Sequence, residues 1–196
     1  MTLKRLLEVM PSPAHPIETV EASQWETFEL ITGIALPDDY KDYFQVFGTG
    51  IIGGVVLPYN PFCTRPWWQV RYSSRAWVPE ALNIQAAKWQ FGVHPFPYAV
   101  YPEPDGVLPW GQTDNGDRLF WLRHGSPHDW HILVNEARSS SFEPCACSMT
   151  EWVCGLIPGD LASTIMPYDA LDQTHLFETI EQGGKRNNMR LESHDQ

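Results

Sequence analysis

The chain has 196 residues, of which 43% are apolar and 13% aromatic, and this is enough for one domain with a sizeable core. Its formal net charge of −11 repels phosphate groups, which argues against nucleic acid or an anionic membrane as a partner and favours a protein with a basic surface. The N-terminal residues lack the apolar segment of a secretory signal, no run approaches transmembrane length, and four cysteines are too few for a disulfide scaffold. We therefore expect a reduced, cytoplasmic protein.

The first part of the chain predicts two helices. A short helix covers residues 2–10, and a second covers residues 18–32. In the second, Trp25, Phe28 and Ile31 recur at three-residue spacing and predict an apolar stripe with glutamates opposite.

A third helix is expected to begin at Pro37. Proline suits the first helical position, and Asp38 and Asp39 favour the positive end of the helix dipole. Its buried face is expected to consist of four aromatic residues, Tyr40, Tyr43, Phe44 and Phe47. Residues 18–42 are also strongly acidic, with seven acids and only Lys41 as a base.

The rest of the chain predicts an antiparallel sheet followed by one more helix. Strands are expected at residues 51–57, 107–113, 118–123, 130–135 and 141–144. Asn115-Gly116 predicts a type I′ turn between the second and third strands, and such a turn needs a positive φ at both residues. Ser148 and Glu151 have the spacing of a capping box and predict a helix over residues 149–156.

Residues 65–91 predict helical structure that is broken near Pro79. Trp67 and Trp68 lie in this segment. Adjacent helical residues point about 100° apart, so one helix face cannot bury both equally. One of the two tryptophans is therefore expected either to pack against another element or to anchor an interface.

This order of elements predicts an α+β fold, a single domain in which helices pack on one face of a mostly antiparallel sheet. The other face of the sheet is then free to bind a partner. We divide the chain into a lead-in helix over residues 1–16, the α+β domain over residues 17–181, and a mobile polar tail over residues 182–196.

Two groups of side chains match zinc chemistry only in part. One group is His124, His128 and His131, with Asp129 among them; the other is Cys145, Cys147 and Cys154. The sequence Gly125-Ser126-Pro127 prevents the histidines from stacking on one helix, and an exposed loop is the alternative. The cysteines need a fourth ligand, and burial in the core is their alternative. We predict no metal.

Carboxylates elsewhere do not form a recognisable active site. Glu103 and Asp105 match the residue types of an acid–base pair, but the sequence brings no nucleophile or oxyanion donor to them. Asp114 and Asp117 flank a turn without the ligand spacing of a calcium loop. Neither a nucleophile elbow nor a phosphate-binding loop is present in the sequence. We predict that the protein is not an enzyme and has no cofactor.

Two motifs lie in order over residues 25–135. The first comprises Trp25-Glu26-x-Phe28-Glu29, Gly33-Ile34-x-Leu36-Pro37-Asp38-Asp39-Tyr40-Lys41 and Phe47-Gly48-Thr49-Gly50. The second comprises Gly106-Val107-Leu108-Pro109-Trp110-Gly111-x-Thr113-Asp114-Asn115-Gly116-Asp117, Leu119-Phe120-Trp121 and Trp130. Together they resemble the SUKH superfamily, the Smi/Knr-type proteins.

The resemblance implies a curved sheet with flanking helices and a role without catalysis. Bacterial members are mostly immunity proteins, which bind and neutralise a cognate toxin that is often a nuclease or deaminase. Fungal relatives regulate cell-wall synthesis, so an adaptor without a toxin partner is the alternative. For toxin neutralisation we expect partner contacts from Glu103, Asp105, Asp114 and Asp117, together with an aromatic side chain from Trp67 or Trp68.

Overall fold

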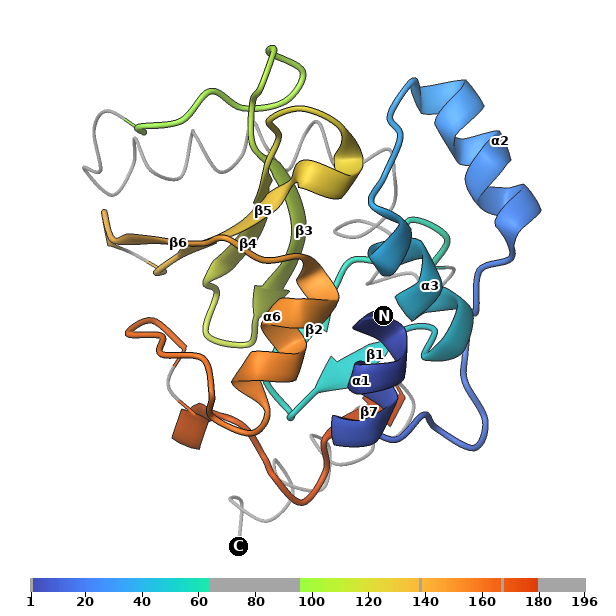
Figure 1. Ribbon diagram of the computed structural model, residues 1–196, viewed down its shortest axis with the longest axis vertical. Helices are drawn as coiled ribbons and strands as arrows, with labels where there is room; N and C mark the ends of the chain where they lie inside the picture. Colours follow the sequence, from blue (N-terminus) through green and yellow to red (C-terminus); the bar gives the residue numbers. More distant parts are fainter. Residues whose placement is uncertain (1, 64–95, 138, 167, 180–196) are drawn as a thin grey trace, which may run out of the picture.

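A computed structural model describes residues 2–63, 96–137, 139–166 and 168–179 (Figure 1). Its described α-helices are α1 (Thr2–Val9), α2 (Ala22–Thr32), α3 (Asp38–Val46) and α6 (Met149–Leu156). Short 3₁₀ turns cover Pro127–Asp129 and Tyr168–Ala170. The strands are β1 (Gly50–Ile52), β2 (Val56–Pro58), β3 (Leu108–Thr113), β4 (Arg118–Leu122), β5 (His131–Asn135), β6 (Phe142–Cys145) and β7 (Phe177–Thr179).

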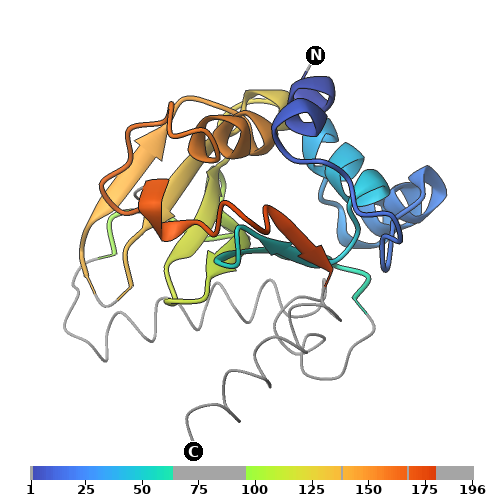
Figure 2. The ribbon, with the colours of Figure 1, turned by 90° about the horizontal axis from the view of Figure 1, so that it is seen from below.

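The seven described strands form one open sheet in the order β6-β5-β4-β3-β2-β1-β7, and every neighbouring pair is antiparallel. Figure 2 shows the curvature of this sheet, with α1, α3 and α6 on one side of it. The α+β prediction is therefore confirmed. None of the helices in the described ranges combines the length and the apolar character needed to cross a bilayer.

Aromatic side chains fill the space between the sheet and the helices. Trp110 of β3 packs against Trp152 of α6 at 5.8 Å between ring centroids, and Tyr40 of α3 packs against Trp121 of β4 at 4.9 Å. All four side chains are at most 1% exposed. The predicted aromatic face of α3 is confirmed, since Tyr40, Tyr43, Phe44 and Phe47 are all fully buried.

Side-chain acceptors fix the starts of the helices. Ser148 accepts the main-chain N–H of Glu151, and the N–H of Ser148 donates to Glu151 Oε2 at 3.0 Å, which confirms the predicted capping box of α6. Asp39, in the first turn of α3, accepts both the N–H and the hydroxyl of Thr150 at 2.9 and 3.0 Å. The carboxylate of Asp39 therefore ties α3 to α6.

The prediction for α2 is wrong in two respects. The helix begins at Ala22 instead of residue 18, because Glu18 has a φ of 56°, outside the helical region. Ile31 is 78% exposed. A step of three residues turns a helix by about 300°, so Ile31 lies about 120° around the axis from Trp25 and outside the buried stripe.

The strand predicted over residues 51–57 is a hairpin. Gly53 and Gly54 have φ values of 55° and 69° and connect β1 to β2 in a tight turn with two positive φ angles. The type I′ turn predicted at Asn115-Gly116 is not formed. Such a turn needs a positive φ at both residues, and Gly116 has one, of 95°, whereas Asn115 does not. The N–H of Gly116 donates to Thr113 O, so a three-residue loop with a glycine bulge joins β3 to β4.

The opposite face of the sheet is not free, contrary to prediction. Phe120 and Leu133 alternate with the main core residues along β4 and β5 and therefore point to the other face. There they pack with Val100 and Val107, which are at most 4% exposed. Val100 and Val107 also form an isolated β-bridge with each other. The segment before β3 thus covers this part of the sheet.

Three further predictions concern the N-terminal helix, residues 65–91 and the C-terminal tail. The predicted lead-in helix is α1, and it packs against α6 with Leu6 fully buried in the main core. The helices predicted over residues 65–91, with Trp67 and Trp68, lie outside the described residues, as does the tail over 182–196.

Replacement of Tyr40 by phenylalanine tests the polar bond at the centre of this core. The buried Tyr40 hydroxyl donates to the main-chain O of Tyr59, and phenylalanine at position 40 removes this buried hydrogen bond. We expect Tyr40→Phe to lower the free energy of unfolding by about 1–3 kcal/mol, measured by urea denaturation. Tyr43→Phe is the control, because the buried Tyr43 hydroxyl has no hydrogen-bond partner within the described chain. A loss as large in Tyr43→Phe as in Tyr40→Phe contradicts this account.

Candidate functional site

The four acids predicted as partner contacts fall into two groups at opposite ends of β3. Glu103 and Asp105 belong to the loop before β3, and Asp114 follows the other end of that strand. A strand of six residues is roughly 20 Å long, so the two groups are separated by the length of β3. Trp67 and Trp68 lie outside the described residues.

The structure uses Asp117 to close the β3–β4 hairpin. Its side chain is 6% exposed. Oδ2 accepts the Thr113 hydroxyl at 2.7 Å, and Oδ1 accepts the N–H of Ala137, after β5, at 2.8 Å. Both oxygens are therefore engaged inside the protein, whereas Asp114 at the tip of the loop remains exposed.

The histidines and cysteines considered as zinc ligands have separate partners in the structure. His124 lies 4.0 Å from Asp105, and His128 lies 3.5 Å from Asp38. Cys145 and Cys147 have their Sγ atoms 2.6 Å apart. Within the described ranges no group of three or more histidine, cysteine or acidic side chains is placed to hold a metal ion.

A groove of about 400 Å³ lies between α2 and α3. It is lined by Val20, Ala22, Trp25, Glu26, Glu29, Asp38, Lys41, Asp42 and Gln45. Helix α2 contributes its positions 22, 25, 26 and 29, and α3 contributes 38, 41, 42 and 45. This spacing of three and four residues places each set on one helix face. The groove is therefore formed by two facing helix surfaces.

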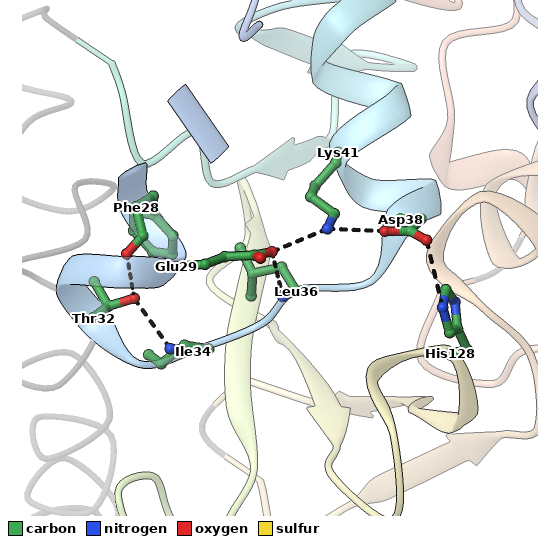
Figure 3. A network of polar contacts seen from close by, with 8 residues as sticks. All are labelled: Phe28, Glu29, Thr32, Ile34, Leu36, Asp38, Lys41 and His128. Carbon is green, nitrogen blue, oxygen red and sulfur yellow. Dashed lines mark hydrogen bonds and ion pairs between the residues drawn. The ribbon is translucent and has the colours of Figure 1, made fainter. Parts of the chain in front are cut away.

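The loop between the two helices is held by the groove residues themselves (Figure 3). Gly33 ends α2 with a φ of 70°, and its N–H donates to Glu29 O. Further along, the N–H of Leu36 donates to Glu29 Oε1 at 3.2 Å, and the buried Leu36 side chain anchors the loop in the core. Glu29 thereby fixes the start of α3 relative to α2.

Lys41 bridges the two walls of the groove. Its ammonium lies 3.0 Å from Glu29 of α2 and 2.9 Å from Asp38 of α3, and Asp38 continues the chain of contacts to His128 (Figure 3). The hydrogen bond from Lys41 lowers the pKa of the Asp38 carboxyl below its usual value. One lysine thus forms an ion pair with one acid on each helix.

Asp42 is in the opposite electrostatic situation. Burial raises the pKa of the Asp42 carboxyl, and the charges of Asp38 and Asp39 raise it further. The carboxylate form is therefore less favourable in the folded protein than in water. Glu26, across the groove, adds a further exposed carboxylate on α2.

Exposed apolar side chains adjoin the groove at the end of α2. Leu30 is 86% exposed and follows Glu26 by four residues, so the two side chains are neighbours on the helix surface. Ile31 is exposed beside it. In Figure 1, α2 lies at the periphery of the molecule, away from the sheet. The groove therefore combines an acidic lining with an apolar rim.

Sequence reasoning did not select this groove, although it contained a signal for it. The acid-rich composition of residues 18–42 was visible. The contact between the two helix faces was not, because it depends on how the loop at Leu36 is anchored.

A family model described as SUKH_6, SMI1-KNR4 cell-wall, matches residues 22–153, more than half of the chain. The matched range begins at the first residue of α2 and ends within α6, so it includes six of the described strands and every lining residue of the groove except Val20. The chain therefore belongs to the SUKH family, as its two motifs suggested. Comparisons with curated proteins and with solved structures gave no match.

Replacement of Asp117 by alanine tests its role in the hairpin. The change leaves the N–H of Ala137 and the Thr113 hydroxyl without their acceptor. We expect a loss of about 1–3 kcal/mol in the free energy of unfolding, followed by tryptophan fluorescence in urea. Asp114→Ala, at the exposed tip of the same loop, should stay within about 0.5 kcal/mol of the wild type. Equal losses of unfolding free energy in Asp117→Ala and Asp114→Ala would contradict the role of Asp117 in closing the hairpin.

Neutralisation of Asp42 and of Asp38 should change stability in opposite directions. The raised pKa of Asp42 means that its carboxylate destabilises the folded state at neutral pH, so Asp42→Asn should raise the urea midpoint at pH 7. The difference should shrink as the pH falls through the carboxyl range, where the wild type binds a proton. Asp38→Asn removes a carboxylate with a lowered pKa and should lower the midpoint. A lower midpoint for Asp42→Asn contradicts the prediction.

Proposed function

We propose that this protein acts by binding rather than by catalysis, and that it neutralises a toxin protein by covering a basic surface of that toxin. The observation that supports this proposal is the groove between α2 and α3. Four carboxylates line it, from Glu26, Glu29, Asp38 and Asp42, against the single ammonium of Lys41. Membership of the SUKH family is compatible with the same role.

The chemistry of the groove suits recognition of a cation. Its described lining consists of carboxylates, one ammonium, one amide and apolar side chains, and it brings no thiol, hydroxyl or imidazole into the cavity. A surface of this kind attracts Lys and Arg side chains of a partner and speeds their encounter, since opposite potentials steer association.

A nuclease toxin fits this surface because its own substrate is an anion. The cleft of such a toxin must be basic to bind phosphate groups. A rigid acidic protein that occupies or flanks this cleft competes with the nucleic acid for the same positive charges. The net charge of −11 adds a long-range attraction to the local contacts.

Co-expression with a candidate toxin tests the proposal. The toxin is taken from the reading frame directly upstream of this gene and is produced in a sensitive host with and without this protein. In cells that produce the toxin, we expect survival only when this protein is also produced. We also expect the two purified proteins to form a complex in size-exclusion chromatography. The double variant Glu26→Lys, Asp42→Lys should protect poorly and bind at least about tenfold more weakly.

The matched control is Glu103→Lys, Asp105→Lys, which makes the same change in charge in the loop before β3. We expect this control to protect like the wild type. If the control variant fails and the groove variant protects, the binding surface is the one predicted from the sequence. If the wild type neither protects nor binds, toxin neutralisation is excluded for that pair, and an adaptor role of the Smi/Knr type replaces it.

A further inference from the structure

We propose that the α2–α3 groove receives one arginine side chain of the partner between Glu26 and Asp42, and that an apolar side chain next to this arginine packs on Leu30. This inference rests on the proposed function and gives the chemistry of the partner's contact. It follows from which carboxylates in the groove are already ion-paired and which are not.

The existing ion pairs leave two acids for an incoming cation. Lys41 engages Glu29 and Asp38, at 3.0 and 2.9 Å. Within the described chain, Glu26 and Asp42 make no comparable hydrogen bond or ion pair, although both line the cavity. One lies on α2 and the other on α3. A cation that enters the groove is therefore flanked by a carboxylate on each side.

The environment of Asp42 favours this occupant. Its side chain is exposed at the groove, and partial desolvation together with the nearby charges of Asp38 and Asp39 raises the pKa of its carboxyl group. Lys41 offsets only part of that repulsion because its ammonium is shared by Glu29 and Asp38. A second positive charge in the groove removes an unfavourable interaction that the free protein carries.

An aromatic side chain forms part of the groove wall. Trp25 lines the cavity and is 4% exposed, and its Nε1–H has no hydrogen-bond acceptor within the described chain. A buried donor without an acceptor costs free energy, but this nitrogen has less than 1 Å² of accessible surface, so a partner does not bond it while the Trp25 side chain keeps this position. Trp25 therefore contributes a ring surface to the wall of the groove.

Arginine fits the geometry better than lysine. Its planar guanidinium presents donors along more than one edge, so it can bond carboxylates on two sides at once. It is also more weakly hydrated than an ammonium, which lowers the cost of entry into a partly enclosed cavity. Lysine, with a compact charge, reaches one carboxylate well and competes with Lys41 for the same kind of position.

The apolar part of the contact is set by the position of Leu30. It is 86% exposed and follows Glu26 by one helical turn. A side chain adjacent to the arginine in the partner's sequence reaches this position when the arginine lies against Glu26. Burial of Leu30 then adds to the affinity because apolar surface leaves water.

A capped dipeptide serves as the probe, so the experiment needs no knowledge of the toxin. N-acetyl-leucyl-arginine amide is titrated into the full-length, ¹⁵N-labelled protein, and amide and indole N–H resonances are followed by NMR. We expect saturable shifts at the residues of the groove, including the indole N–H of Trp25. The same peptide with citrulline in place of arginine keeps the shape and removes the charge, and it should bind at least about fivefold more weakly.

Three variants make the test specific. Glu26→Gln, Asp42→Asn should weaken binding of the arginine probe at least about fivefold, and Leu30→Ser should weaken it about twofold to fivefold. Glu103→Gln, Asp105→Asn removes the same charge from the loop before β3 and should leave binding unchanged. Each variant is first shown to keep the dispersed amide spectrum of the folded wild type.

The inference is overturned by any of three results. These are shifts that do not saturate or lie outside the groove, equal binding of the arginine and citrulline probes, and equal binding by the wild type and Glu26→Gln, Asp42→Asn. A lysine probe that binds as tightly as the arginine probe overturns the choice of arginine. Toxin neutralisation is measured separately in cells, so it can hold while the probe test fails, and the two failures are distinguishable.

Discussion

The position of Tyr40 is the constraint on which the other packing in this protein depends. Its ring lies between α2 and the sheet, 5.8 Å from Trp25 and 4.9 Å from Trp121, while its hydroxyl holds the main chain at Tyr59, just after β2. Because Trp25 also lines the α2–α3 groove, the same contacts that fill the core set one wall of the candidate site. The groove is therefore supported by the core and does not depend on loops alone.

Local signals in the sequence predicted the parts of the fold that local chemistry determines. The capping box at Ser148 and the strands on either side of Asn115-Gly116 needed only neighbouring residues, and both are present. The geometry of that turn was mispredicted, since Asn115 keeps a negative φ and the following glycine alone takes the positive one. Strand β7 was missed, because its three residues are too few to show a recognisable alternation of apolar and polar side chains.

The candidate site was harder to predict than the fold, because its residues act in pairs from different helices. Acid content alone did not distinguish Asp117, which closes a hairpin from inside, from Asp42, which faces a cavity. The distinction depends on burial and on hydrogen-bond partners, which the sequence does not show. If the proposed function holds, Asp42 also illustrates why a binding surface can reduce stability, because its carboxylate lies among like charges while no partner is bound.

The pairing of β7 with β1 has a consequence for how the protein is made. Ile52 pairs with Phe177, so the two strands leave the ribosome at widely separated times. During that interval one edge of β1 has no neighbour, and open strand edges are templates for pairing with other chains. Strand β7, the last of the described strands in the sequence, thus pairs late with an edge that is made early. Truncation before Phe177, or slow synthesis of the later part of the chain, should expose that edge and favour aggregation of nascent chains.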